Sequence, residues 1–237
     1  MKNLGDQWAH GSGIFETIRV EDGKVFALHR HHCRAKETAT KLGYEIPSEE
    51  FVAAESHQVI QSEDFSLGRL RWHFDRNGEF SISYVPFQDP VTSAKLMIFD
   101  ERKAEFDIKN KEYPYKNLEL LEIAKLNNFD DGIIIRSDGQ VAETSMATLL
   151  LKLNETWVTP PLSSGILNGV VRALVLEAGL AQVGRVDEDD LKDVKSGILL
   201  TSLRNAQNIG AIDGRKLVID ERKCAEIHKL MQEFKGR

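Results

Sequence analysis

Strand-like segments separated by short turns fill the middle of the chain, and they limit the folds that it can adopt. Four such segments lie at residues 132–136, 140–143, 147–151 and 156–159, with turn residues between them. Helical segments at 117–127 and 170–178 flank this run, and Gly179 is placed to end the second helix. Strands and helices grouped in this way predict an α+β fold.

The N-terminal third shows the same kinds of signal and predicts a separate, smaller unit. Strands are expected at 15–20, 24–28, 70–74 and 80–85, the last two around the hairpin signal Asn77-Gly78, and helices at 29–42 and from Pro47 onward. Residues 88–93 break the pattern and are the predicted linker. We therefore expect a small α+β domain over residues 1–88 and a larger domain over residues 94–237. The larger domain includes a late strand at 198–202 and a terminal helix at 221–234.

Composition narrows the class of protein. The 237 residues carry a net charge of -6, and the pI is near 5.7, which argues against nucleic acid as the main partner. No apolar run is long enough to cross a bilayer, and the first residues do not form a signal peptide, so no membrane partner is expected. Cys33 and Cys224 are too few for a disulfide framework and suit a reducing compartment. A cytoplasmic protein is the expectation.

Lys116 and Glu143 are the residues most suggestive of chemistry. Lys116 lies just ahead of the helix predicted at 117–127, and Glu143 ends the strand predicted at 140–143. A lysine amine can form a Schiff base with the aldehyde of pyridoxal phosphate (PLP), and a carboxylate can keep the pyridine nitrogen protonated. Taken singly each residue could equally be solvated, because the chain has 31 lysines and arginines. The pair is nevertheless what a PLP site requires.

Three further segments could hold a phosphate group. The loop 165–169 runs directly into a helix, whose first backbone amides, on Val170 and Val171, lack partners within the helix. Arg34 could bind phosphate with two hydrogen bonds, and Thr201 and Ser202 offer hydroxyl groups at a strand end. Each segment also has an ordinary interpretation: a loop before a core helix, a solvated arginine, and turn or capping chemistry.

A metal site is an alternative at one place in the sequence. His29, His31, His32 and Cys33 cluster within the first predicted helix. These side chains spread around the helix instead of sharing one face, and no second pair of ligands accompanies them. The sequence therefore predicts no metal site.

The order of the motifs is more informative than any one of them. Six short motifs follow one another along the chain: residues 15–19, His31 with Arg34, 116–122, Glu143, 165–172, and Thr201 with Ser202. This series resembles the fold-type IV (class IV) PLP enzymes, which include branched-chain and D-amino acid aminotransferases and aminodeoxychorismate lyase. The resemblance covers roughly residues 13–212.

The resemblance implies a role for each predicted residue. Lys116 would be the Schiff-base lysine and the catalytic base, and Glu143 the partner of the pyridine nitrogen. Arg34, the backbone of Val170 and Val171, and Thr201 or Ser202 would hold the cofactor phosphate. The implied fold is a small α+β domain and a larger pseudo-barrel domain with the cofactor between them. A homodimer acting on a small-molecule amine is expected.

The chain also departs from the family pattern. Ser12 stands in the motif at residues 10–14 where an aspartate is common, and the usual first strand and Asp-Arg turn ahead of it are missing. The helix after Lys116 is shortened, and residues 144–148 lack the asparagine often found there. These changes leave the expected cofactor residues in place. They bear instead on the substrate preference and on the structure of the N-terminal edge.

The resemblance favours one reaction within the family. Residues 15–20 read Phe-Glu-Thr-Ile-Arg-Val, a strand frequent in the lyase branch. D-amino acid aminotransferases carry an Arg-x-His carboxylate trap where this chain has a tight turn at 75–78, and branched-chain enzymes usually have a longer N-terminal domain. We expect a 4-amino-4-deoxychorismate lyase that gives p-aminobenzoate and pyruvate in folate synthesis. The alternatives are a class IV aminotransferase for branched-chain or D-amino acids, a family member without turnover, and an unrelated binding protein.

Overall fold

The computed structural model describes residues 13–77, 79–100 and 115–237, with side chains from Asn117 onward in the last range. The chain divides into two compact units, Met1–Asp89 together with Met231–Arg237, and Pro90–Leu230. The division between Asp89 and Pro90 falls inside the linker predicted at residues 88–93. Residues 231–237 group with the first unit, although the sequence placed them in the larger domain.

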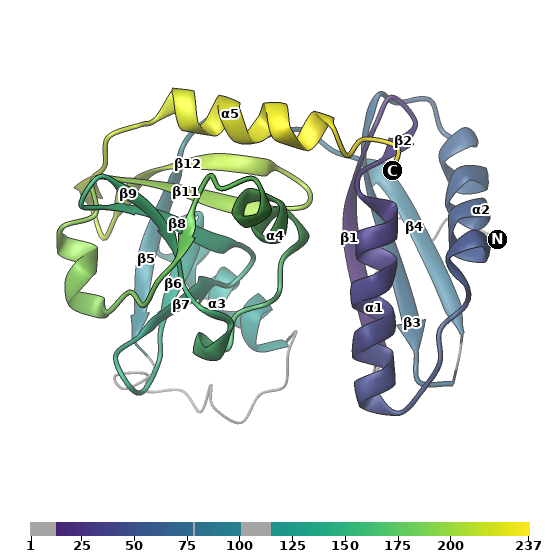
Figure 1. Cartoon of the computed structure of the whole chain (residues 1–237), viewed down its shortest axis with the longest axis horizontal. Coiled ribbons are helices and arrows are strands. Elements are labelled where there is room, and N and C mark those ends of the chain that lie inside the picture. Colours follow the sequence, from purple (N-terminus) through teal and green to yellow (C-terminus); the bar gives the residue numbers. More distant parts are fainter. Residues whose placement is uncertain (1–12, 78, 101–114) are drawn as a thin grey trace. The chain divides into compact units, whose positions relative to one another are not determined.

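The first unit is an antiparallel sheet covered on one face by two helices (Figure 1). The strand order is β2-β1-β3-β4. The strands are β1 (Gly13–Glu21), β2 (Lys24–Val25), β3 (Leu67–Asp75) and β4 (Phe80–Pro86), and the helices are α1 (Leu28–Leu42) and α2 (Glu49–Gln61).

Alternating side chains along the strands form the core of this unit. Leu70, Trp72 and Phe74 on β3 are fully buried, as the period of two in a strand requires when one face is covered. Trp72 Nε1 donates a hydrogen bond to Ser56 Oγ of α2 over 2.9 Å, which satisfies its buried polar atom. Helix α1 ends at Leu42 as predicted, with Gly43 as its C-cap in the left-handed conformation, and α2 begins close to the predicted Pro47, with Ser48 Oγ accepting from the Phe51 amide as its N-cap.

The C-terminal residues belong to this unit because they pair with its edge. The Ala27 amide donates to the Phe234 carbonyl over 2.9 Å, and the Gly236 amide donates to the Val25 carbonyl over 2.9 Å. These bonds satisfy backbone groups beside the short edge strand β2. Sequence periodicity cannot reveal such a pairing between distant segments.

The second unit is a curled mixed sheet with helices outside it (Figure 1). The order is β10-β9-β8-β11-β12-β5-β6-β7, and β13 pairs with β12. The strands are β5 (Ala94–Asp100), β6 (Asp131–Ile135), β7 (Val141–Thr144), β8 (Thr148–Leu153), β9 (Thr156–Thr159), β10 (Gln182–Val183), β11 (Ser196–Thr201), β12 (Asn205–Ile212) and β13 (Arg215–Lys216). The helices are α3 (Tyr115–Leu126), α4 (Val170–Glu177) and α5 (Glu221–Gln232), with short 3-10 turns at Leu162–Ser164 and Glu188–Lys192.

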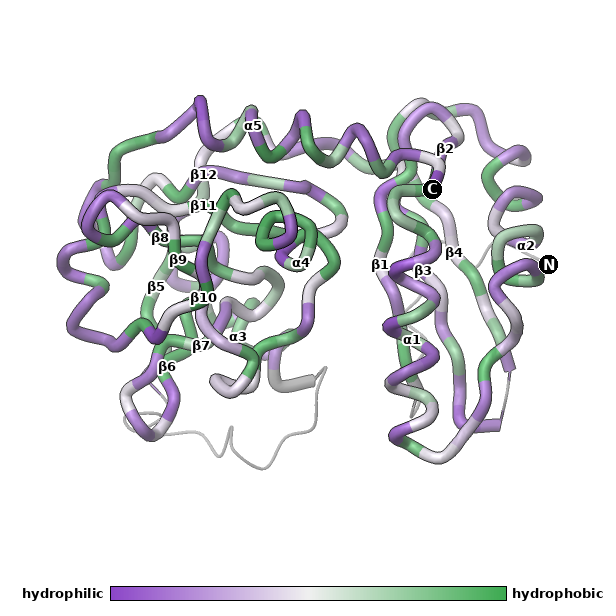
Figure 2. The backbone as a smooth tube through the Cα atoms, in the orientation of Figure 1, coloured by the Kyte–Doolittle hydropathy of each residue, from purple (hydrophilic) through white to green (hydrophobic). Residues whose placement is uncertain are grey.

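The core of the second unit lies inside the curl. One cluster of buried residues includes Val141 of the edge strand β7, Leu149 of β8 and Ile209 of β12. Strands that are far apart in the sheet order therefore share a core, as in a pseudo-barrel. Figure 2 shows hydrophobic residues along β5, β6 and β8 of this sheet, whereas much of β12 is hydrophilic. The predicted α+β, fold-type IV architecture is confirmed.

Within the part of the chain that the structure describes, no helix has the length and apolar character needed to cross a membrane.

Candidate active site

Three of the segments that were predicted to carry the chemistry meet in the second unit. Leu120 of α3, Ile134 of β6, Ala142 of β7 and Ile166 of the loop before α4 form one buried cluster. The helix with Lys116, the strand with Glu143 and the predicted phosphate loop are therefore packed together around shared apolar contacts.

Lys116 is the second residue of α3 and not the residue ahead of it, as the sequence had suggested. Its side chain lies outside the described residues, so its role as the Schiff-base lysine stays a prediction. The motif residues 10–12 likewise lie outside the described part of the chain.

Glu143 is a half-buried carboxyl on β7. The Leu167 amide donates to Glu143 Oε2 over 3.1 Å. Burial, together with the negative charge of Asp131, raises the pKa of Glu143 to about 7, and the Leu167 hydrogen bond only partly opposes this rise. Among the described residues no cation is paired with Glu143. A carboxyl in this state would gain from a positively charged partner such as a protonated pyridine nitrogen.

The loop before α4 is fastened to the β6–β7 hairpin. Arg136 Nη1 donates to the Ser164 carbonyl over 3.0 Å, and Ser164 Oγ contacts Gln140 Oε1 at 3.1 Å. Gly165 has φ of 77°, a left-handed conformation that glycine adopts without strain. These contacts fix where the loop enters the helix.

The N-terminus of α4 presents Val170 and Val171 in its first turn. Gly169 is the N-cap and provides no capping side chain. A Cβ atom at Gly169 would lie 3.3 Å from Thr148 Oγ1, so a larger residue would crowd the space beside the helix start. The first-turn amides of a helix with no capping side chain suit a phosphate group.

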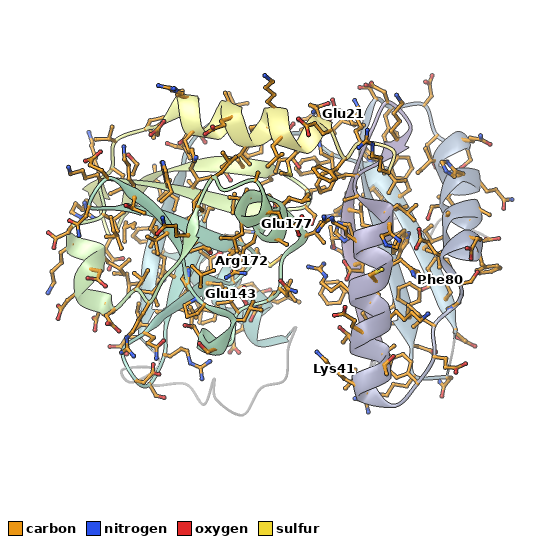
Figure 3. All side chains as sticks on the ribbon, in the orientation of Figure 1. Glu21, Lys41, Phe80, Glu143, Arg172 and Glu177 are labelled. Carbon is orange, nitrogen blue, oxygen red and sulfur yellow. The ribbon has the colours of Figure 1, made fainter. Side chains whose placement is uncertain are left out.

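Arg172 secures the other side of this loop. It is only 4% exposed, and it donates from Nε to Thr159 Oγ1 over 3.2 Å and from Nη2 to the Pro160 carbonyl over 2.8 Å. Burial lowers its pKa. Figure 3 shows Arg172 and Glu143 on their elements.

Thr201 and Ser202 lie where β11 turns into β12. The Arg204 amide donates to Thr201 Oγ1 over 3.0 Å, so this hydroxyl accepts one bond and keeps a proton to donate. The capping chemistry considered for this turn is therefore present, and phosphate binding stays a prediction.

Arg34 belongs to the first unit, where it binds Glu16. Arg34 Nε donates to Glu16 Oε1 over 2.9 Å, and Nη2 also contacts Glu16. His31 Nδ1 lies 2.7 Å from Glu16 Oε2. Glu16 is 2% exposed, and His31 is 0% exposed. Although burial alone would raise the pKa of Glu16, His31 and Arg34 lower it. Phosphate binding by Arg34 stays a prediction.

The histidines of α1 contact neighbouring side chains and backbone. His29 Nδ1 contacts Glu49 Oε2 at 2.7 Å, and His32 Nδ1 lies 3.9 Å from the same oxygen while its Nε2 contacts the Pro47 carbonyl at 2.8 Å. Cys33 Sγ lies 3.4 Å from His29 Nε2. Within the described residues no three His, Cys, Asp or Glu side chains converge to hold a metal ion.

Sequence reasoning missed three hydrogen-bonded polar residues, of which Asp131 lies close enough to Glu143 for its charge to act on it. Asp131 is a buried carboxylate at the first position of β6, Ser145 follows β7, and Asn117 follows Lys116. Hydrogen bonds join Asp131 to Ser145 and Ser145 to Asn117. The available signal was an acidic residue at the start of an otherwise apolar strand, a position that requires a partner when it is buried.

The comparison with protein families decides the broad identity. The family model for amino-transferase class IV matches residues 13–212, most of the chain.

The chain belongs to the class IV aminotransferase family.

Class IV aminotransferases use PLP, so the protein is a PLP-dependent enzyme, and the expected family and cofactor are confirmed. The residues present fit the cofactor. Glu143 is a half-buried carboxyl that would gain from a cationic partner, and α4 opens without a capping side chain. Glu143 would hold the pyridine nitrogen, and the amides of Val170 and Val171 would hold the phosphate.

Relatives of both branches of the family match nearly the whole chain. The "Putative aminodeoxychorismate lyase" of Schizosaccharomyces pombe is 26% identical over 228 residues, which cover 92% of this chain and 95% of that protein. The "Probable branched-chain-amino-acid aminotransferase" of Rickettsia typhi is 25% identical over 249 residues, 93% of this chain and 86% of that protein.

Solved structures show the same fold. A crystal structure from Legionella pneumophila, titled as a "Putative 4-amino-4-deoxychorismate lyase", aligns with a TM-score of 0.81 at 20% identity. The alignment covers 94% of this chain and 91% of that one.

Proposed function

We propose that the protein is a 4-amino-4-deoxychorismate lyase, which converts its substrate to p-aminobenzoate and pyruvate in folate synthesis. Strand β1 carries the proposal, because residues 15–19 read Phe-Glu-Thr-Ile-Arg, the sequence frequent in the lyase branch. Two of its polar residues are engaged: Glu16 binds Arg34, and Arg19 binds Asp89 with two bonds of 2.8 Å.

The β3–β4 hairpin supports the same proposal. Asp75 Oδ1 accepts hydrogen bonds from the amides of Asn77 over 2.8 Å and Glu79 over 2.7 Å. This closed turn stands where D-amino acid aminotransferases carry a loop with an Arg-x-His carboxylate trap. The similarity to the Schizosaccharomyces pombe protein over nearly the full length of both chains also favours the lyase.

Each residue of the proposed site has a chemical task. When bound, PLP withdraws electrons from the substrate carbon that bears the amino group, which makes the proton on that carbon acidic. The Lys116 amine takes this proton, and Glu143 keeps a proton on the pyridine nitrogen. The enolpyruvyl oxygen leaves with its bonding electrons as the ring becomes aromatic. The leaving group then takes up a proton and is released as pyruvate.

Binding and orientation fall to the remaining residues. The amides of Val170 and Val171 donate to the phosphate, Thr201 and Ser202 add hydroxyl donors, and Arg34 adds positive charge. We also expect a homodimer, as is usual for the family, and light scattering would measure its mass in solution. The expected location is the cytoplasm.

The test exploits the difference in stoichiometry between the two branches. The lyase products contain all atoms of the substrate, so no keto acid is needed, whereas a transaminase requires an acceptor. PLP-loaded protein is given aminodeoxychorismate without keto acid, and p-aminobenzoate and pyruvate are measured. We expect equal amounts of both products from the native protein and from Lys125→Ala, an exposed-lysine control on the same helix, and none from Lys116→Ala.

The second candidate is a branched-chain aminotransferase, which the similarity to the Rickettsia typhi protein favours. A PLP-loaded native protein that releases no p-aminobenzoate, but transfers amino groups from leucine, isoleucine or valine to a keto acid, would contradict the lyase and support this candidate.

A further inference from the structure

Asp131 is the centre of a buried hydrogen-bond network next to Glu143. It is 2% exposed, and its Oδ1 accepts from the Gly132 amide over 2.7 Å, from the Ser145 amide over 3.1 Å and from Ser145 Oγ. Its Oδ2 accepts from Thr144 Oγ1 over 2.8 Å. A buried carboxylate is tolerated only when donors surround it, and here four donors do so.

The same network reaches the helix that carries Lys116. Asn117 Nδ2 donates to the Ser145 carbonyl over 2.7 Å. Ser145 is therefore bound through its amide and hydroxyl by Asp131 and through its carbonyl by Asn117. Asn117 directly follows Lys116, and Ser145 lies two residues beyond Glu143.

The turn around Ser145 is itself closed by local bonds. The Thr144 amide donates to the Ala147 carbonyl over 2.8 Å, and the Ala147 amide donates to Thr144 Oγ1 over 2.9 Å. The backbone of this turn therefore has little freedom to adjust. A shift of Asp131 on one side of Ser145 would move the bond to Asn117 on the other side.

We propose that Asp131 and Asn117 are positioning residues that, through Ser145, set the distance between the start of α3 with Lys116 and the end of β7 with Glu143. The proposal rests on the roles proposed above for Lys116 and Glu143. Groups that act on one cofactor must keep their separation closely, since an error of about 1 Å can cost up to about 100-fold in rate. The buried side chains of Leu120 and Ala124 hold α3 against the sheet, but apolar packing is non-directional, whereas the hydrogen bond from Asn117 to Ser145 fixes one defined distance at the start of the helix.

Asp131 also acts on Glu143 through its charge. Its negative charge contributes to the raised pKa of Glu143. The two effects can be separated by substitution. Asp131→Asn removes the charge while its amide oxygen can still accept from Ser145 and Gly132, whereas Asp131→Ala removes both the charge and the acceptors.

The chain provides a matched control for each residue: Asp130 is the neighbour of Asp131, and Asn127 lies at the opposite end of the helix that carries Asn117. Asp130 is exposed and accepts from the Lys95 amide over 2.7 Å, so Asp130→Asn makes the same chemical change outside the network. Asn127 lies just beyond the other end of α3, where its Nδ2 donates to the Ile123 carbonyl over 2.8 Å. Asn127→Ala therefore removes a comparable amide bond.

The test measures PLP affinity and the pKa of Glu143, neither of which depends on the reaction catalysed. We expect Asn117→Ala and Asp131→Ala to weaken PLP binding roughly three- to tenfold, the effect of a hydrogen bond or two, and to shift the pH titration of the cofactor's visible band. In the apoprotein, carbon NMR of the Glu143 carboxyl should show a lower pKa in Asp131→Asn and an unchanged pKa in Asn117→Ala. Both control variants should match the native protein.

A purely structural role gives a different result. If Asn117→Ala and Asp131→Ala lower the melting temperature but bind PLP and titrate as the controls do, the positioning proposal is overturned. Should Asp131→Ala fail to fold, Asn117→Ala, which alters a partly exposed side chain, decides the question alone. A native protein that binds PLP but releases no p-aminobenzoate would remove the lyase assignment and leave this proposal standing.

Discussion

The Leu167 amide donates to Glu143 Oε2, so the carboxyl proposed to face the pyridine nitrogen is bound by the loop that leads into the proposed phosphate-binding helix. Ile166 of the same loop packs with Ala142, the neighbour of Glu143. The loop before α4 would therefore position both the pyridine nitrogen and the phosphate of the cofactor. A change that moves this loop should alter the contacts to the pyridine ring and to the phosphate together.

The raised pKa of Glu143 predicts how the stability of the apoprotein depends on pH. Its pKa in the fold is about 7, against an ordinary value of 4.5 for a glutamate, so the folded state holds this proton more tightly than the unfolded state. The stabilisation is complete below about pH 4.5 and is lost as the pH rises through about 7. Relative to Glu143→Gln, the native apoprotein should lose on the order of 1–3 kcal/mol over this range.

Urea unfolding of both apoproteins at about pH 5 and about pH 8 measures the difference. Glu122→Gln, which alters an exposed carboxylate on α3, serves as the control and should show no such pH dependence. A constant difference between Glu143→Gln and the native protein at the two pH values would mean that the carboxyl titrates normally.

Gly165→Ala should destabilise the fold and loosen the loop before α4. The left-handed φ of 77° disfavours a residue with a Cβ atom, and that atom would lie 2.3 Å from Arg136 Nη1, which holds the Ser164 carbonyl. We expect a loss of about 1–3 kcal/mol in the free energy of unfolding, together with weaker PLP binding. Ser163→Ala, an exposed neighbour, should stay within about 0.5 kcal/mol of the native protein.

Glu16→Gln should lower the free energy of unfolding, because it leaves the Arg34 guanidinium without its carboxylate partner. His31 has a lowered pKa because it is buried, so the ion pair of this cluster is the one between Glu16 and Arg34. We expect a loss of about 2–4 kcal/mol at neutral pH, slightly below the roughly 3–5 kcal/mol for a broken buried ion pair because Arg34 is only partly buried. Since the pKa of Glu16 is lowered, this contribution is present above the ordinary glutamate pKa of 4.5 and disappears as the pH falls through the pKa of Glu16 in the folded state.

Chemical denaturation across the acid range tests the Glu16 prediction. Glu37→Gln on α1 changes an exposed carboxylate and should be nearly neutral. Equal small effects for the two variants would show that the buried cluster does not stabilise the first unit.

Arg172→Met should destabilise the segment before α4, where Arg172 binds Thr159 and Pro160. The change removes the donors to Thr159 Oγ1 and the Pro160 carbonyl, but it also removes a buried charge, so the net loss should be about 1–3 kcal/mol. Thermal unfolding measures this loss. Arg185→Met, which breaks an exposed ion pair with Asp187, should cost about 0.5 kcal/mol or less. An Arg172 variant as stable as the Arg185 variant would contradict the anchoring role.

Local sequence signals predicted most of the longer elements that the structure describes but missed the short strands β10 and β13 and the long strand β12, and the failure at β12 has a physical cause. Strand β12 was not predicted, because residues 205–212 contain two asparagines, a glutamine and a glycine and lack the apolar alternation of a strand. Its position between β11 and β5 supplies the backbone partners that its composition does not suggest. Tertiary context therefore overrides propensity at this strand.

The candidate site was predictable in its motifs but not in its contacts. Glu143 was identified from its place at the end of a predicted strand, whereas its bond to Leu167 joins segments that are distant in the sequence. The same holds for Asp131, whose donors on Thr144 and Ser145 come from the next strand of the sheet. Spacing along a chain does not report such partners, because they depend on how the sheet brings its strands together.

The most direct test of the proposed site locates the lysine that carries the cofactor. PLP-loaded protein is reduced with borohydride, digested and analysed by mass spectrometry. We expect the phosphopyridoxyl group on Lys116 and its loss in Lys116→Ala, with the label unaffected in Lys125→Ala. A label on Lys125 or another lysine, or no label in a protein that has bound PLP, would contradict the assignment of Lys116 and the mechanism that depends on it.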